Sequence, residues 1–421
     1  MPKSELDASS RKPVRVAVLN THPIQYFAPL YAYLTRFEPS IELTALYCSD
    51  YSLRGAVDDG FEQKVVWDVD LLEGYRSVFL GAAARTRIPR GFLSLIVPQV
   101  WREIRSGRYD VLWLHGYGYL ACVIAFLAAR SMRMPILFRG ETHLRLARSG
   151  WRRRIRDQIL KWGFARVDAF LAIGSQNLDY YRQMGIAAEC IHIVPYAVDN
   201  QRFITMAAIA NGHRDSRRAQ LGFTSGVPVV LYASKLVERK HPQTLIRAIS
   251  RLQRRGKEVG LCMVGSGPME NALRELAVTL QVKNIHFLGF RNQSELPSIY
   301  AACDVFVLAA ESEPWGLVVN EVMCAGLPVI VSDELGCAAD LVQSGRNGWT
   351  VPAGDDIALA EAIGHQVADP ATCRRMGQAS LARIENWGFA ECKQGLMAAI
   401  QRVSLSTDQQ KHSPVATEGS H

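Results

Sequence analysis

The sequence predicts an α/β protein built from two Rossmann-like domains, each a doubly wound parallel sheet, that face a central cleft. The first observation behind this fold class is length, because 421 residues are more than a single hydrophobic core usually contains. The second is a repeated pattern in which short apolar runs alternate with longer amphipathic runs in both halves of the chain. That alternation is typical of a parallel sheet covered by helices.

The apolar runs place the strands of the two domains. In the first domain, expected over residues 14–205, they are 14–19, 41–47, 111–114, 135–138, 169–173 and 190–194. A polar and basic stretch at 206–226 is expected to be the linker. In the second domain, expected over 227–385, the strands are 227–232, 260–264, 285–288, 304–308 and 329–331. The carboxyl ends of both sets of strands would meet at the cleft, where such folds bind ligands.

The composition is that of an ordinary soluble protein, with 48% hydrophobic and 21% charged residues. No apolar run approaches the roughly 20 residues that a membrane-spanning helix requires. The N-terminus, Met1 to Glu5, lacks the apolar core of a signal peptide. The nine cysteines are scattered and form no Cys-x-x-Cys pair, which argues against a zinc module or a disulfide framework. A cytoplasmic protein is therefore expected, with the cysteines as small core residues.

The formal net charge of +8 is concentrated in the first domain. Residues 85–166 contain 17 Arg and Lys but four acids, and the block is centred on 145–156. Such a cluster can attract an anionic membrane surface, a phosphate-bearing acceptor or nucleic acid, or it can be a solvated helix face. No zinc finger or aromatic RNA-binding signature accompanies it, so a nucleic-acid partner is not expected. Trp151 beside the arginines favours a helix lying on the inner face of the cytoplasmic membrane.

The strongest functional signal is the pair of carboxylates at Glu313 and Glu321. An apolar strand at 304–308 precedes them, and the Pro-Trp-Gly turn between them indicates that a helix begins near Leu317. The free amides at a helix start can bind hydroxyl or phosphate oxygens. Because ionised carboxylates accept hydrogen bonds, one acid could hold a sugar and the other a ribose. Two isolated glutamates would more often be a capping residue and a surface acid.

The surrounding sequence decides between these interpretations. The stretch 313–321 resembles the donor motif of the family 4 retaining nucleotide-sugar glycosyltransferases, and the likeness extends over roughly 14–400, most strongly over 227–352. The resemblance implies the GT-B fold, with Glu313 on the transferred sugar and Glu321 on the ribose of the donor.

The same resemblance implies further donor contacts. They are Gly265 in a glycine turn, Phe290 and Arg291 near the nucleobase, and the backbone amides of Trp315, Gly316 and Leu317 on sugar hydroxyls or phosphate. On its own, Gly265-Ser-Gly267 is a weak signal that fits a simple tight turn equally well. Glu311 is a competing first acid, but Glu313 has the family spacing.

Two lysines stand where the family binds the donor diphosphate. The stretch 232–241 resembles the family loop that carries two cations five positions apart, and Lys235 and Lys240 occupy those positions. A departing diphosphate gains negative charge, which fixed cations stabilise. The usual Gly-Arg of the family is Ser234-Lys235 here, so a bidentate fork is replaced by a point charge.

The first domain is expected to supply the acceptor side. His115 follows a strand, as does the family histidine that approaches the donor sugar, although a lone histidine after an apolar run is more often structural. At the next strand end, Arg139, Glu141 and His143 are candidates to line the acceptor site.

The first loop departs from the family. Many members have glycines after the first strand, whereas this chain has Asn20-Thr-His-Pro-Ile-Gln-Tyr-Phe27. With bulky residues there, the loop must contact a ligand through side chains, and His22 and Gln25 are the candidates.

The C-terminal region is expected to return to the first domain. Residues 386–403 resemble the family helix that crosses back and braces that domain. Residues 406–421 are polar without an apolar period and are expected to be disordered.

The sequence therefore predicts transfer of a sugar from a nucleoside diphosphate sugar to an acceptor hydroxyl with retention of the anomeric configuration. The resemblance implies front-face substitution without a protein nucleophile, a metal or another cofactor, and Glu313, Lys240 and His115 would be the catalytic residues. Asp68-Val-Asp70 resembles the metal motif of the other glycosyltransferase fold, but the companions of that motif are missing.

Other functions remain as alternatives. A nucleotide-sugar epimerase shares the architecture but not the Glu-x7-Glu spacing, and a dehydrogenase would need a Gly-x-Gly-x-x-Gly fingerprint after the first strand. A scaffold or sugar-nucleotide sensor conflicts with the intact Glu313, Glu321 and Lys240. The expected acceptor is a lipid-linked or other saccharide of bacterial surface polysaccharide or glycolipid assembly, with a soluble small molecule as the alternative.

Overall fold

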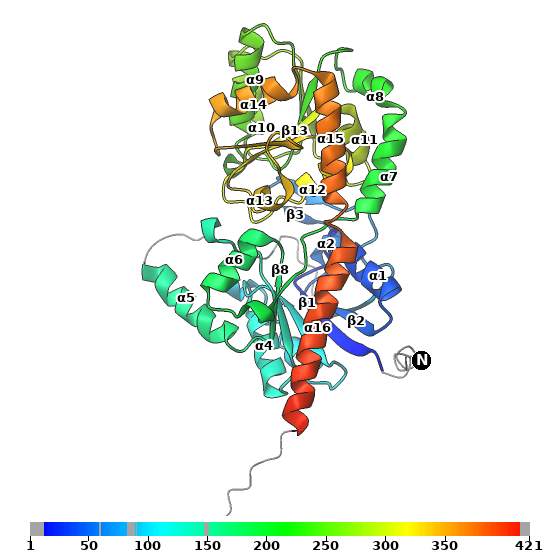
Figure 1. The fold of residues 1–421 in the computed structure, drawn as a ribbon, viewed down its shortest axis with the longest axis vertical. Coiled ribbons are helices and arrows are strands. Elements are labelled where there is room, and N and C mark those ends of the chain that lie inside the picture. The colour runs from blue at the N-terminus through cyan, green and yellow to red at the C-terminus, as the bar shows by residue number, and fades with distance from the viewer. Residues whose placement is uncertain (1–11, 59, 82–88, 90, 147–150, 413–421) are drawn as a thin grey trace, which may run out of the picture.

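The computed structural model describes residues 12–58, 60–81, 89, 91–146 and 151–412. Within them the chain forms two α/β domains, drawn one above the other in Figure 1. The first-domain sheet has the strand order β5-β2-β1-β6-β7-β8-β9, and the second-domain sheet has the order β12-β11-β10-β13-β14-β15. The strand pairings described within these two sheets are parallel. The predicted fold class of two doubly wound domains is confirmed.

The strands have the following bounds. The first sheet contains β1 (Val14–Asn20), β2 (Ile41–Tyr47), β5 (Arg76–Phe79), β6 (Val111–His115), β7 (Ile136–Arg139), β8 (Ala169–Ala172) and β9 (Ile191–Ile193). The second contains β10 (Val229–Ala233), β11 (Gly260–Val264), β12 (Ile285–Gly289), β13 (Val305–Leu308), β14 (Val329–Ser332) and β15 (Gly348–Val351). A separate antiparallel hairpin consists of β3 (Ala56–Asp58) and β4 (Gln63–Val65).

The helices alternate with these strands. In the first half they are α1 (Ala28–Phe37), α2 (Tyr51–Arg54), α3 (Gln99–Ile104), α4 (Leu120–Ser131), α5 (Trp151–Phe164), α6 (Ser175–Gln183), α7 (Asn200–Asn211) and α8 (Arg214–Gln220). In the second half they are α9 (Pro242–Arg254), α10 (Glu270–Thr279), α11 (Leu296–Ala302), α12 (Val318–Cys324), α13 (Ala338–Leu341), α14 (Asp356–Gln366), α15 (Pro370–Ile384) and α16 (Phe389–His412).

Each sheet reverses its strand order at one point, between β1 and β6 in the first and between β10 and β13 in the second. Loops that leave the two strands at such a point diverge to opposite faces of the sheet, and the crevice between them is where ligands of these folds bind. Because β10 and β13 pair directly, through Val230 opposite Val305, the loops that follow them start side by side. Those loops carry the predicted lysines and Glu313.

The central strands are buried on both faces, which explains why they are nearly continuous apolar runs. All four residues of β13, Val-Phe-Val-Leu, are buried, and so are all five of β10. All nine cysteines are free and eight are buried, as expected for small core residues.

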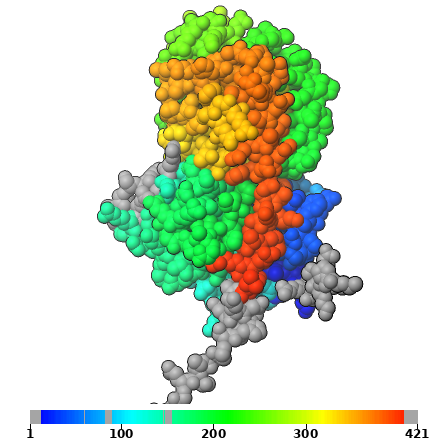
Figure 2. Space-filling model, in the orientation of Figure 1, coloured from blue at the N-terminus to red at the C-terminus, as the bar shows by residue number. Residues whose placement is uncertain are grey.

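Helix α16 joins the second domain to the first. It follows α15 and lies along the surface of the first domain, as Figures 1 and 2 show. Its inward side chains, Cys392, Leu396, Ala399, Ile400 and Val403, recur at helical spacing and are buried in the first-domain core with residues of α1 and β1. The predicted crossing helix is therefore present, although it extends beyond 403.

The chain passes between the domains twice, after β9 and again before α16, and the two crossings are adjacent. The side-chain amide of Asn200 donates a hydrogen bond to the carbonyl of Ile384 at 2.9 Å. The ring of Trp387 stacks on Trp315, with centroids 5.6 Å apart and an angle of 16° between the planes. These contacts tie the second crossing to the first and to the turn that carries Glu313.

The stretch predicted as a linker, 206–226, is largely helical, because α7 and α8 run through it. Phe203 and Phe223, just before and within it, are buried in the second-domain core. Its arginines are not a solvated connection: Arg214 and Arg218 form ion pairs with Asp304, at 2.6 and 3.1 Å. The arginines that suggested a linker therefore pair with one shared carboxylate, which lies directly before β13.

Three further details differ from the prediction. The edge strands β5 and β15 were not expected, because each has four residues in which polar residues or glycine interrupt the apolar ones, as in Arg76-Ser-Val-Phe79 and Gly348-Trp-Thr-Val351. Residues 406–412, predicted to be disordered, continue α16, and 413–421 lie outside the described residues. No helix in the described ranges combines the length and apolar character needed to cross a bilayer.

Candidate functional site

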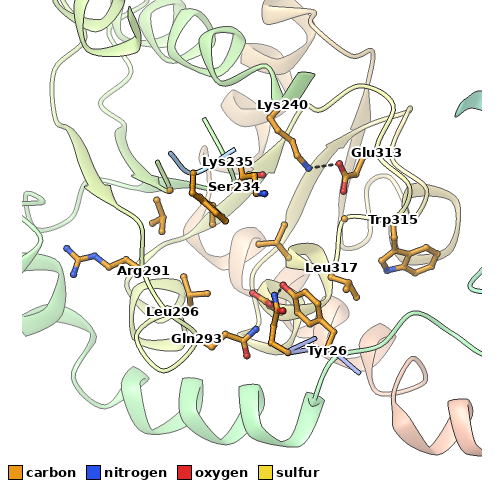
Figure 3. Close-up of a pocket in the computed structure, with 18 of the residues that line it drawn as sticks. Tyr26, Ser234, Lys235, Lys240, Arg291, Gln293, Leu296, Glu313, Trp315 and Leu317 are labelled. Atoms are coloured by element: carbon orange, nitrogen blue, oxygen red, sulfur yellow. Dashed lines mark hydrogen bonds and ion pairs between the residues drawn. The ribbon is translucent and has the colours of Figure 1, made fainter. Parts of the chain in front are cut away.

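A cavity of about 400 Å³ lies between the two domains, at the point where the strand order of the second sheet reverses. Its second-domain walls are the loops after β10, β11, β12 and β13, and its first-domain walls include the loop after β1 and the β3–β4 hairpin. Figure 3 shows that Lys235, Lys240 and Glu313 surround one end of the cavity, with Tyr26, Gln293 and Leu317 toward the other.

Glu313 is held by two cations from the neighbouring loop. Its Oε2 lies 2.5 Å from Nζ of Lys240 and 2.8 Å from Nη1 of Arg239. Burial alone would raise the pKa of Glu313, but the two cations outweigh this effect and hold the pKa below its ordinary value. The carboxylate is therefore ionised at neutral pH. Lys240 is only 6% exposed, so this ion pair is largely shielded from water.

The competing acid Glu311 lies away from the cavity. Its side chain is half exposed, and its carboxylate is 3.4 Å from Nε2 of His241. The geometry therefore favours Glu313 as the acid that faces a ligand.

Two local features fix the turn that carries Glu313. Gly316 has φ +93°, a left-handed conformation that glycine adopts without strain. Trp315 is buried, and its indole Nε1 donates to the side-chain oxygen of Asn320 at 2.9 Å. Helix α12 then begins at Val318, next to the position predicted from the sequence, and the cavity wall includes Trp315, Gly316 and Leu317.

Glu321, in the first turn of α12, lies at the other end of the cavity and is 2% exposed. Its two oxygens accept hydrogen bonds from the hydroxyls of Tyr300 at 2.7 Å and Tyr26 at 2.9 Å. Burial raises the pKa of this carboxyl to about 7, although the two tyrosine hydrogen bonds work in the opposite direction. The pKa of Glu321 is thus raised while that of Glu313 is lowered, although both acids line one cavity. Tyr26 comes from the first domain, so this contact spans the cleft.

Lys235, the other predicted phosphate ligand, is also paired across the cleft. Its Nζ lies 2.7 and 2.8 Å from the two carboxylate oxygens of Asp58, in the β3–β4 hairpin. The predicted glycine turn after β11 packs against the loop after β10, which carries Lys235. A side chain at Gly265 would place its Cβ 2.0 Å from the carbonyl oxygen of Ser234, so this position requires glycine.

The predicted nucleobase residues form the remaining wall. The ring of Phe290 lies edge-on to Phe61 of the hairpin, with centroids 5.0 Å apart, and 6.3 Å from Trp67. Arg291 also lines the cavity, and its Nη1 forms an ion pair with Glu295 at 3.0 Å.

The first-domain candidates differ in how close they lie to the cavity. Gln25 and Glu141 line the cavity. His143 contacts the backbone of the site and not the cavity wall: its Nε2 lies 3.2 Å from the backbone oxygen of Glu313. His22 and Arg139 are not in the wall. His22 packs on Tyr51, and burial lowers its pKa to about 3, so the ring is neutral.

Arg139 and His115 lie deeper, in the aromatic packing of the first domain. The guanidinium of Arg139 lies over the rings of Phe27 and Tyr196, at 5.2 and 4.9 Å from their centroids. His115 packs between Phe27 and Trp113, and burial, followed by the charge of Arg139, lowers its pKa well below the ordinary value. His115 is therefore a neutral ring outside the cavity wall, and its catalytic role stays a prediction.

Several residues around the cavity were not selected from the sequence. Arg239 could have been found, because it lies between the two chosen lysines in one loop. Tyr26, Asp58, Phe61 and Trp67 carry no local signal, since each becomes relevant only when the first domain folds over the second.

The Asp-x-Asp pair has structural partners instead of a metal environment. Asp68 accepts hydrogen bonds from the backbone amide and hydroxyl of Ser294, and Asp70 accepts from the amide of Leu72. Across the described ranges, no group of three His, Cys, Asp or Glu residues is arranged to hold a metal ion.

Comparison with known proteins agrees with this geometry. Residues 46–197 match the model of the glycosyl transferase 4-like domain, and residues 213–383 match the model of the glycosyl transferases group 1. The D-inositol 3-phosphate glycosyltransferase of Nocardia farcinica is 27% identical over 322 residues, covering 73% of this chain and 69% of that protein. A GDP-mannose-dependent monoacylated alpha-(1-6)-phosphatidylinositol monomannoside mannosyltransferase of Corynebacterium glutamicum is 29% identical over 242 residues, covering 56% of this chain and 62% of that protein.

Solved structures show the same fold. Anabaena Alr3699/HepE in complex with UDP superposes with a TM-score of 0.69 at 18% identity, covering 94% of this chain and all of that one. The α,α-trehalose 6-phosphate synthase of Burkholderia multivorans has a TM-score of 0.71 at 14% identity, covering 96% of this chain and all of that one. The relatives named above are transferases, and nothing in these findings supports the epimerase alternative. With both of its domains matched in order, the chain belongs to the family 4 glycosyltransferases.

Proposed function

We propose that the protein transfers a sugar from a nucleoside diphosphate sugar to an acceptor hydroxyl and retains the anomeric configuration. The observation that carries this proposal is the arrangement of Lys235, Lys240, Glu313 and Glu321 around one cavity at the reversal point of the second sheet. Cations at one end suit a diphosphate, and carboxylates suit hydroxyls. The cavity also has an aromatic wall for a base.

The proposed reaction is a front-face substitution. The bond between the anomeric carbon and the diphosphate oxygen breaks, and the acceptor oxygen bonds to the same carbon from the same face. The acceptor proton passes to the departing phosphate oxygen. Lys240 and Arg239 stabilise the negative charge that accumulates there, while Glu313 accepts hydrogen bonds from sugar hydroxyls. We propose that no metal or other cofactor takes part, since lysine and arginine supply positive charge at the phosphate end.

The proposed acceptor is a lipid-linked saccharide at the inner face of the cytoplasmic membrane, in surface polysaccharide or glycolipid assembly. Part of the support is α5, on the outer flank of the first domain (Figure 1). Its Ile155, Ile159 and Trp162 are 53, 63 and 58% exposed, and Arg154 and Lys161 beside them are exposed as well. Apolar and basic side chains together on one exposed helix suit an anionic bilayer surface. The relative named for a phosphatidylinositol monomannoside acceptor is consistent with this choice, whereas D-inositol 3-phosphate, in the name of the other relative, is a soluble molecule and matches the small-molecule alternative.

A donor screen tests the proposed activity. The purified protein should be stabilised by one of UDP, GDP, ADP, CDP or dTDP, by about 2.7 kcal/mol at a hundredfold excess over the Kd. The corresponding nucleotide sugar, labelled in the sugar, should then transfer label to an acceptor with release of the diphosphate. Transfer, as opposed to isomerisation of the donor, separates this activity from that of an epimerase. Absence of binding by every nucleotide would contradict the proposal.

Membrane association is tested by sedimentation with vesicles containing phosphatidylglycerol. The protein should bind these vesicles and be released as salt increases, because basic side chains contribute to the contact. Replacing Ile155 and Ile159 with serine should lower binding at least about tenfold, since each apolar side chain gains about 1.5–3 kcal/mol on burial. The matched control is Val278→Ser, which removes an apolar residue that is 78% exposed in the second domain. Equal loss in the control, or no binding at all, would reject this surface.

A further inference from the structure

A segment of the first domain crosses the cleft and docks on the second. It comprises residues 56–58 and 60–68, the β3–β4 hairpin with the three residues after it, and is called the strap below. The strap contacts the second-domain loops that follow β10, β11 and β12, the first of them through Lys235. The hydroxyl of Ser266 donates to the carbonyl of Phe61 at 2.9 Å, and the side-chain amide of Asn292 donates to the carbonyl of Val66 at 2.7 Å. The loops after β11 and β12 carry the predicted glycine turn and nucleobase wall.

Asp58 is the charged contact of the strap. Both of its carboxylate oxygens lie within 2.8 Å of Nζ of Lys235, and its Oδ1 also accepts the backbone amide of Gly60 at 2.8 Å. The carboxylate is thus held in a turn of its own and directed at a cation of the opposite domain. Lys235 is the cation that the family resemblance assigns to the donor diphosphate. A donor phosphate and the Asp58 carboxylate therefore require the same partner.

The backbone of the strap is pressed onto the same loops. A side chain at Gly60 would place its Cβ 2.7 Å from Cδ of Lys235, and one at Gly267 would come within 2.9 Å of the carbonyl oxygen of Gly60. Glycine at both positions permits this approach. The strap therefore packs directly against the glycine turn and Lys235. It lies beside the cavity that Asp58 and Phe61 line.

We propose that Asp58 takes the place of a donor phosphate on Lys235 in the donor-free protein, so that a nucleoside diphosphate binds by displacing this carboxylate. The inference rests on the proposed function and goes beyond it, because it makes a first-domain residue the competitor that sets donor affinity. An ionised carboxylate beside an ammonium neutralises the charge that would attract phosphate, and binding must break the existing pair before making the new one.

The far end of the strap is anchored independently of Asp58. Asp68 accepts the amide of Ser294 at 3.0 Å, and Trp67 lies against Phe290, with ring centroids 6.3 Å apart. Displacement of Asp58 consequently requires movement of the hairpin tip alone.

The test is the affinity of the full-length protein for UDP, GDP, ADP, CDP and dTDP, measured by calorimetry. Asp58→Asn should bind the preferred diphosphate about five- to thirtyfold more tightly than wild type, which corresponds to about 1–2 kcal/mol for removal of a partly buried ion pair. Asp58→Ser should behave in the same way. The matched control is Glu62→Gln, which removes one negative charge from the same strap at an exposed residue outside the cavity wall, and should leave affinity unchanged.

The outcomes separate this inference from the proposed function. If Asp58 instead positions Lys235 for the donor, both Asp58 variants bind the diphosphate more weakly, and the inference is overturned. Unchanged affinity in the Asp58 variants, or an equal gain in Glu62→Gln, overturns it as well, because the effect would then be absent or due to net charge. In each of these cases diphosphate binding persists and the proposed function stands. If no variant binds any nucleoside diphosphate, both proposals fail together.

Discussion

Replacing Glu313 with glutamine is expected to lower the rate of sugar transfer by a factor on the order of 10³, while the protein stays folded and still binds the nucleoside diphosphate. Glutamine keeps the size of the side chain but removes the negative charge, and with it the strongest acceptor for sugar hydroxyls. It also removes the counter-charge that orders Lys240 and Arg239, which lie 2.5 and 2.8 Å away. Loss of one fixed electrostatic contact at a reacting group typically costs about 10²–10³ in rate.

Initial rates of diphosphate release in the presence of acceptor would measure this effect. The matched control is Glu311→Gln, two residues earlier, where the carboxylate contacts His241 at the rim and lies outside the cavity wall. That variant should retain nearly all activity. Near-normal turnover in Glu313→Gln, or a comparable loss in the Glu311 variant, would remove Glu313 from its assigned role.

Lys240→Met should weaken binding of the nucleoside diphosphate about 10- to 100-fold and slow transfer further. The substitution keeps an apolar stem of similar length in a position that is 6% exposed, so it removes the charge with little loss of packing. A buried cation facing a diphosphate contributes more to the free energy of binding than an exposed one, because little water screens its charge. Glu313 keeps Arg239 as a partner, so the variant does not leave that carboxylate isolated.

Calorimetric titration with the preferred diphosphate measures the expected loss. Lys283→Met provides the control, since that lysine is exposed in the same domain and lies outside the cavity wall. Unfolding temperatures of both variants would show that packing is retained. If Lys240→Met bound the diphosphate as tightly as wild type, Lys240 would have no part in the phosphate site.

The second domain could be predicted closely because its site depends on local sequence. Glu313 and Lys240 follow two strands that pair with each other, so their spacing after those strands determines that they meet. The structure of residues 206–226 was harder to predict. Arginines there that seemed to face solvent form ion pairs with a single carboxylate, Asp304, about 90 residues later. Composition records the charges but not the partner.

The first-domain side of the site could not be predicted in the same way. The contact between Asp58 and Lys235 joins residues 177 positions apart, and that between Tyr26 and Glu321 joins residues 295 apart. No periodic pattern encodes such pairs. His115 illustrates the opposite case: its position at a strand end was correct, but the ring turns into the aromatic packing with Phe27, which a strand pattern does not reveal.

The paired crossings between the domains limit how the protein can move. The two connections are adjacent and are tied by the hydrogen bond from Asn200 to Ile384, so relative motion of the domains must pivot near this point. The contacts of Asp58 with Lys235 and of Tyr26 with Glu321 both lie across the cleft. Rotation must therefore lengthen both at once. A rotation about these crossings that widens the cleft would therefore expose the proposed phosphate end and the proposed ribose end of the cavity together.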